Sequence, residues 1–139
     1  MTVNDELVLA LIRHVTARGG AVLADDIALS WLKIMRKFAP LIGASSVLLM
    51  FERSIENNLA TFGWLPVLAL PMQADTAVER LRASLATRPR AEILAAHRAI
   101  LASFIDLMTT LIGARLTVQF LHAALPAASA GSTTEEKHA

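Results

Sequence analysis

The chain has 139 residues, of which 55% are hydrophobic and 18% charged, with a net charge of +1 and no cysteine. This length fits one domain, and the nearly neutral charge gives no reason to expect a nucleic-acid partner. The lack of cysteine excludes disulfides, thiolate nucleophiles and Cys-rich metal sites. Soluble domains usually carry about 25% charged residues, so polar side chains are too few here to cover a monomer comfortably. We therefore expect the surplus apolar surface to face a second subunit, a ligand or a membrane surface.

The first half of the chain predicts three helices, at about 4–18, 21–38 and 41–59. In each of them apolar residues recur at intervals of three or four, which places them on one face of a helix. A glycine pair is expected to end the first helix and Pro40 the second, because neither residue type suits a helix interior. The segment 60–75 contains a glycine and two prolines among apolar residues, and we expect an irregular, partly buried connector there.

The second half predicts three more helices, at about 76–87, 89–112 and 115–125. Thr76 and Glu79 have the spacing of a capping box, in which each side chain accepts a hydrogen bond from the other residue's backbone N–H. No segment alternates with the period of two that a strand requires. We therefore expect an all-α fold, with five to six helices in one compact bundle.

The domain expected from this pattern covers residues 1–126. Residues 127–139, "AASAGSTTEEKHA", are expected to form a disordered tail, because small and polar side chains bury too little apolar surface to offset the entropy of ordering. The acidic start of the chain is unlike a signal peptide, which together with the absence of cysteine favours a cytoplasmic protein. Uncharged runs shorter than a bilayer requires indicate that no helix spans a membrane, while contact with a membrane surface stays open.

The predicted helix over 89–112 has the clearest pattern in the chain. Its apolar side chains form two adjacent rows with alternating spacings of four and three, which make a face wider than one partner helix needs. We expect this helix to be central to the fold or to pair with itself across the axis of a homodimer. The candidate interface residues are Ile93, His97, Ile100, Leu101, Phe104, Ile105 and Met108.

The tetrapeptide Leu-Ile-Gly-Ala occurs twice, starting at Leu41 and at Leu111, seventy residues apart. The same shift aligns several apolar positions and the expected helix breaks, which suggests two pseudo-equivalent halves at about 5–74 and 75–125. A chance match in a chain rich in leucine and alanine is the other interpretation. If the halves are equivalent, the glycines of the two tetrapeptides should occupy equivalent corners.

No pattern of residues predicts catalysis. The four histidines include no pair spaced for a metal, and the HExxH, P-loop and GxGxxG motifs are absent. His97 has a core-type position, where a buried neutral imidazole is the structural interpretation and a pH switch or ligand contact the functional one. We expect no enzyme, no cofactor and no metal site.

Three functions fit these observations. The first is a non-enzymatic helical interaction module, regulatory or signalling, which self-associates through the helix at 89–112 and binds a protein partner that the sequence does not identify. The second is a sensor of a small apolar molecule, with a pocket formed by Trp31, Trp64, His97 and Phe104. The third is a peripheral membrane protein that uses the region 38–72.

Overall fold

The structure is a computed structural model that describes residues 6–8 and 20–125. Within these residues all regular structure is helical, and no strand is present. A helical turn covers residues 6–8, and the longer helices are α2 (Gly20–Ile42), α3 (Ala44–Glu56), α4 (Ala74–Ala86), α5 (Arg90–Ile112) and α6 (Ala114–Ala124). The prediction of an all-α bundle is therefore confirmed. The expected tail over 127–139, and the expected helix over 4–18 apart from 6–8, lie outside the described residues.

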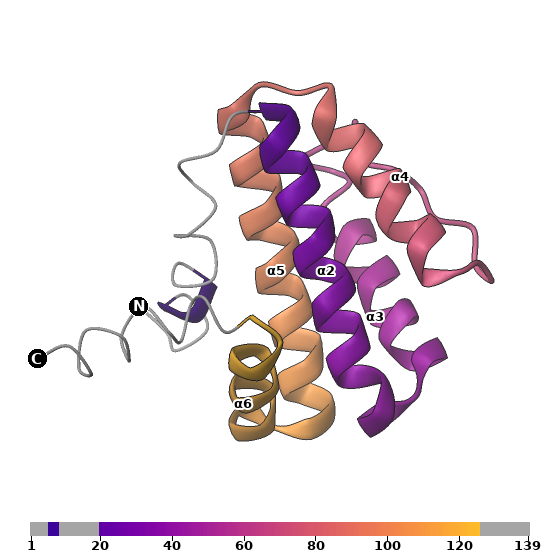
Figure 1. Ribbon diagram of the computed structural model, residues 1–139, viewed down its shortest axis with the longest axis vertical. Coiled ribbons are helices and arrows are strands. Elements are labelled where there is room, and N and C mark those ends of the chain that lie inside the picture. Colours follow the sequence, from indigo (N-terminus) through magenta and orange to yellow (C-terminus); the bar gives the residue numbers. More distant parts are fainter. Residues whose placement is uncertain (1–5, 9–19, 126–139) are drawn as a thin grey trace, which may run out of the picture.

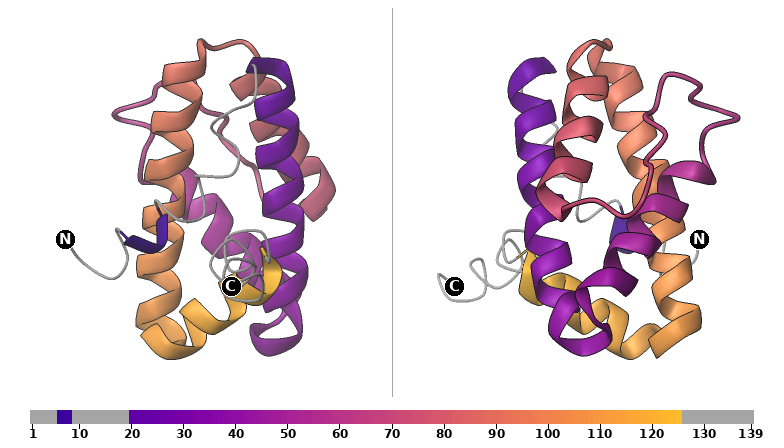
Figure 2. Two further views of the ribbon diagram at one scale, coloured as in Figure 1. Left: turned by 60° about the vertical axis from the view of Figure 1, so that its left-hand side comes forward. Right: turned by 90° about the vertical axis from the view of Figure 1, so that its right-hand side faces the viewer.

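Two long helices, α2 and α5, run side by side in the same direction and form the centre of the bundle (Figure 1). Each turns at its lower end into a shorter helix that runs back upward, as both views in Figure 2 also show. The short helices contact both long ones: α3 packs against α2 and α5, and α6 packs against α5 and α2. The remaining helix, α4, covers the upper part of α2 (Figure 1). The core therefore lies between α2 and α5 and is closed by helices from both halves of the chain.

The prediction that Pro40 ends the second helix is wrong. The helix α2 continues through Pro40 to Ile42, and the Gly43 N–H donates to the Ala39 carbonyl at 2.8 Å to close the last turn. A proline removes one helical hydrogen bond and crowds the carbonyl one turn earlier, a defect that the end of a helix tolerates better than its middle. As a result α3 starts at Ala44, later than expected, and ends before residue 59.

The predicted capping box is also wrong. The helix α4 starts two residues before Thr76, and its N-cap residue, Gln73, makes no side-chain capping bond. The Glu79 carboxylate instead accepts two hydrogen bonds from the Arg82 guanidinium, at 2.7 and 2.8 Å. A bidentate, charge-assisted pair of this kind is stronger than a neutral backbone bond, so Arg82 takes the carboxylate that the capping box required.

The two Leu-Ile-Gly-Ala stretches form equivalent corners. The helices α2 and α5 both have 23 residues, and each ends at a glycine with positive φ, Gly43 at 95° and Gly113 at 91°. Short helices follow both glycines directly, and both corners lie at the same end of the bundle (Figure 2). Residues 20–56 and 90–124 therefore repeat one helix–glycine–helix unit with a shift of seventy.

The helix α5 is long and apolar enough to cross a membrane by length and composition. Its most apolar 18-residue window has a mean hydropathy of 1.3, and 44% of that window is buried inside the bundle. The core helix of a soluble bundle has the same properties, because its apolar face is covered by other helices. Contacts of α5 with α2, α3 and α6 provide that cover here.

Candidate functional site

The candidate interface residues on α5 all lie in the core of the single chain. Their exposed fractions run from 0% to 3%, because α2, α3 and α6 pack against this face of α5. The wide apolar face that suggested a homodimer is thus already covered within one subunit. Pairing of two subunits through Ile93, His97, Ile100, Leu101, Phe104, Ile105 and Met108 would require the bundle to open.

Three of the four candidate pocket residues meet, and the fourth lies elsewhere. The Trp31 ring packs against Phe104 with centroids 5.1 Å apart and against His97 at 6.4 Å. All three side chains are buried, and the rings of His97 and Phe104 both contact Trp31, so they fill this part of the core. Trp64 lies in the connector between α3 and α4, where it contacts Phe62 at 6.0 Å between ring centroids.

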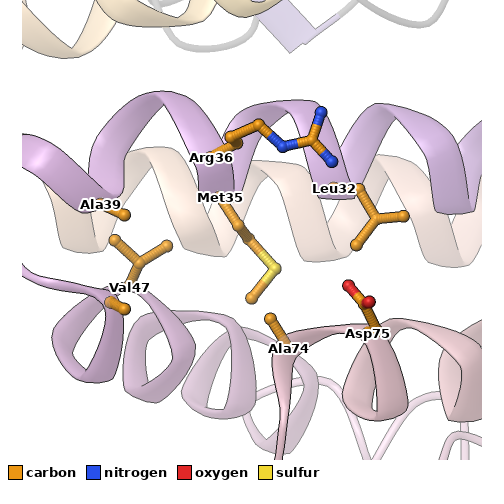
Figure 3. A pocket seen from close by; sticks show the side chains of 8 residues that line it. Leu32, Met35, Arg36, Ala39, Val47, Ala74 and Asp75 are labelled. Carbon is orange, nitrogen blue, oxygen red and sulfur yellow. The ribbon is translucent and has the colours of Figure 1, made fainter.

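A cleft of about 180 Å³ lies where α2, α3 and the start of α4 come together (Figure 3). Its interior is apolar, and two charged residues, Arg36 from α2 and Asp75 from α4, stand at its rim. No ion pair joins Arg36 or Asp75 to any residue in the described part of the chain. The residues around the cleft are Leu32, Met35, Arg36, Ala39, Ala44, Val47, Ala74 and Asp75.

The end of the bundle that carries the two corners has an apolar surface. Leu41, Leu111 and Leu116 are 41%, 53% and 38% exposed there, and we call these three residues the corner face. The segments 38–51 and 107–121, which build this end, include a single charged residue, Arg115. Exposed leucines are common singly, but a group of them at one end is typical of a contact surface.

Three cations stand above the corner face on α2. Lys33, Arg36 and Lys37 border a hollow of about 210 Å³ between α2 and the end of α6, and no acidic residue borders it. Lys37 is four residues before Leu41, which is one helical turn, or about 6 Å along the axis. On the α2 side, the corner face is therefore apolar at its tip and cationic one turn behind it, whereas on α5 the nearest charged residue before Leu111 is Asp106.

Two arginines near the end of α4, Arg82 and Arg88, have partners close by in the sequence. Arg82 binds Glu79 and lies 3.6 Å from an Asp25 carboxylate oxygen. Arg88 donates two hydrogen bonds to Glu92 and lies 5.3 Å from the centroid of the Trp64 ring. The guanidinium groups of Arg82 and Arg88 are therefore both paired with carboxylates of the same chain.

Two carboxylates, those of Glu52 and Glu56, lie one turn apart on α3. Burial raises the pKa of Glu52, the negative charge of Glu56 raises it further, and Arg53 opposes both effects. Within residues 6–8 and 20–125 no group of three or more His, Asp or Glu side chains is arranged to hold a metal ion. The pair is thus a surface feature of the helix end rather than part of a larger constellation.

No protein family, curated protein or solved structure matches the chain. Sequence reasoning missed the cleft, since Arg36 and Asp75 come from helices whose contact no local pattern indicates. It found the corners as a repeated tetrapeptide, without the information that both lie at one end.

Proposed function

We propose that this protein is a non-enzymatic helical interaction module that docks on an anionic membrane surface through the corner face. The observation that carries the proposal is the exposure of Leu41, Leu111 and Leu116. They lie next to the two corners, which are at one end of the bundle (Figure 2), and the segments 38–51 and 107–121 that build this end contain no acidic residue. Apolar side chains that insert between lipid headgroups, with cations at the level of the phosphates, are the usual composition of such a surface.

The depth of the charged residues supports a membrane rather than a second copy of the chain. Lys37 lies about 6 Å behind Leu41 along α2, and the apolar side of an interfacial helix is buried by about 5–10 Å. Two copies that met through their corner faces would instead bring Lys37 and Arg115 of one copy toward those of the other. Such like-charge contacts oppose association.

Vesicle flotation tests the proposal. We expect the full chain to float with vesicles that contain phosphatidylglycerol, but not with phosphatidylcholine alone, and we expect salt to reduce the bound fraction. The double variant Leu41→Glu/Leu111→Glu should remain at the bottom of the gradient. Val22→Glu is the matched control, because Val22 is 48% exposed near the opposite end of α2.

Two results would contradict the proposal. One is flotation that the double variant retains. The other is a concentration-dependent dimer, seen by light scattering in the absence of lipid, that the double variant abolishes. That dimer would make a second copy the occupant of the corner face.

A further inference from the structure

The cleft between α2, α3 and α4 has the interior of a small hydrophobic site. Met35 and Val47, which lie on α2 and α3, are 5% and 1% exposed. Figure 3 shows the Met35 side chain reaching from α2 toward the start of α4, where Ala74 faces it. Alanines at Ala39 and Ala44 complete the wall beside the corner, and their short side chains leave the space open.

The volume of the cleft restricts what it can hold. A cavity of about 150 Å³ accepts a molecule the size of benzene, whereas sites for drug-sized ligands measure about 300–1,000 Å³. At about 180 Å³, this cleft accommodates an aliphatic side chain of a few carbons. It is too small for a nucleotide or a long acyl chain.

The charges at the rim define the polar end of such a ligand. Arg36 and Asp75 both lie toward the end of the cleft that Leu32 occupies (Figure 3). Neither has an ion-pair partner in the described ranges of the chain. A guanidinium binds carboxylates, and a carboxylate binds ammonium groups, so the rim is complementary to a molecule that carries both.

We propose that this cleft binds a free α-amino acid with an aliphatic side chain, of the size of leucine. The side chain would lie on Met35 and Val47, the carboxylate would bind Arg36, and the ammonium group would bind Asp75. This inference goes beyond membrane docking. The two sites share Arg36, which borders both the cleft and the cationic hollow, but no residue of the corner face lines the cleft.

Titration of the full-length protein with L-leucine, followed by NMR, tests the site. We expect saturable binding, with shifts confined to residues around the cleft. Two analogues remove one charge each: 3-methylbutylamine lacks the carboxylate and 4-methylpentanoate lacks the ammonium group. Each should bind about tenfold more weakly than leucine or worse, the effect expected for losing a charge-assisted hydrogen bond.

Variants locate each contact. Arg36→Gln should weaken leucine and 4-methylpentanoate but leave 3-methylbutylamine unchanged, and Asp75→Asn should show the opposite pattern. Ala44→Leu should abolish binding of all three by filling the cleft with both charges intact. Lys37→Gln is the matched control, since Lys37 is the next cation along α2 and does not line the cleft.

Some results of the same titrations would overturn the proposal. Absence of saturable binding up to the solubility limit of leucine would reject it, as would leucine binding that neither Arg36→Gln nor Asp75→Asn affects. Equal binding of leucine and both analogues would show that the rim charges have no role. The Leu41→Glu/Leu111→Glu variant should bind leucine normally, so failure of membrane docking and failure of this site are distinguishable.

Discussion

Gly43 and Gly113, seventy residues apart, have the same backbone conformation and the same hydrogen bonds. Their φ and ψ angles are 95° and 144° for Gly43 and 91° and 157° for Gly113. Each N–H donates to the carbonyl four residues earlier, at 2.8 and 2.9 Å, and each carbonyl accepts from the N–H four residues later, at 3.1 and 3.2 Å. The same corner structure therefore occurs twice in the chain.

Alanine at either glycine should destabilise the fold by a similar amount. A Cβ atom would meet no other atom within 4 Å at Gly43 or Gly113, so the cost is that of the backbone conformation alone, about 1–3 kcal/mol. Gly63→Ala is the matched control, because Gly63 lacks a positive φ and its added Cβ would lie 3.9 Å from the nearest atom. Urea unfolding measures all three, and a Gly113→Ala variant as stable as the wild type would contradict the prediction.

The core position of α5 predicts opposite behaviour for two of its apolar residues. Ile100 is 0% exposed and Leu111 is 53% exposed. Ile100→Ala should lower the free energy of unfolding by about 2–5 kcal/mol, whereas Leu111→Ala should change it by about 0.5 kcal/mol or less. If Ile100 served a subunit interface instead, its substitution would change the oligomeric state in light scattering and leave the monomer's stability nearly intact.

The two tryptophans should differ in their access to a quencher. Trp31 is 0% exposed among packed rings, while Trp64 is half-buried beside the positive charge of Arg88. Iodide is a charged quencher that does not enter protein cores, so Trp64→Phe should remove most of the iodide quenching of the wild type. Trp31→Phe serves as the comparison and should keep it. Strong quenching in the Trp64→Phe variant would mean that the Trp31 site opens to solvent.

Stability should respond to pH through Glu52. Its pKa is raised from the ordinary value of 4.5, first by burial and then by Glu56, so the folded state holds this proton more tightly than the unfolded state does. The folded state therefore loses stability relative to the unfolded state as the pH rises from about 4.5 through the raised pKa of the folded state. Glu52→Gln should be more stable than the wild type at about pH 7 and equal to it at about pH 3, where the carboxyl is protonated in both states.

The effect of Glu79 on stability should have the opposite pH dependence to that of Glu52. Hydrogen bonds from Arg82 lower the pKa of Glu79, so its contribution to stability is present above the unfolded pKa and is lost as the pH falls through the folded pKa. Glu79→Gln should consequently be slightly less stable than the wild type at neutral pH, with the difference fading in acid. Urea titrations at both pH values measure the pair, and differences of equal sign for the two variants would contradict the assignment.

Local signals predicted some elements closely. The helix at 89–112 was placed to within one residue of α5, because Pro89 stands before its first turn and Gly113 directly after its last. The prediction for α2 was wrong at Pro40. The effect of a proline depends on its distance from the end of the helix, and the local sequence does not fix that distance. The Thr76 capping box failed for a different reason, because α4 begins at Ala74 and Arg82 binds the Glu79 carboxylate.

The candidate sites were harder to predict than the helices. Periodicity showed that α5 has a wide apolar face, but not that α3 and α6 cover it from distant parts of the sequence. Of the four residues predicted to line a pocket, Trp31, His97 and Phe104 lie together in the core, whereas Trp64 lies in the connector. No pattern indicated that Arg36 and Asp75 border the same cleft, because that depends on where the connector places the start of α4.

Each half of the chain packs a short helix against the long helix of the other half. The helix α2 is covered by α4 and α6 from the second half, while α3 from the first half packs against α5. Neither half encloses a core of its own, so a fragment containing only one half should stay unstructured. Two fragments made by cutting the connector between α3 and α4 should fold on mixing, and the fold should thus be recoverable by fragment complementation.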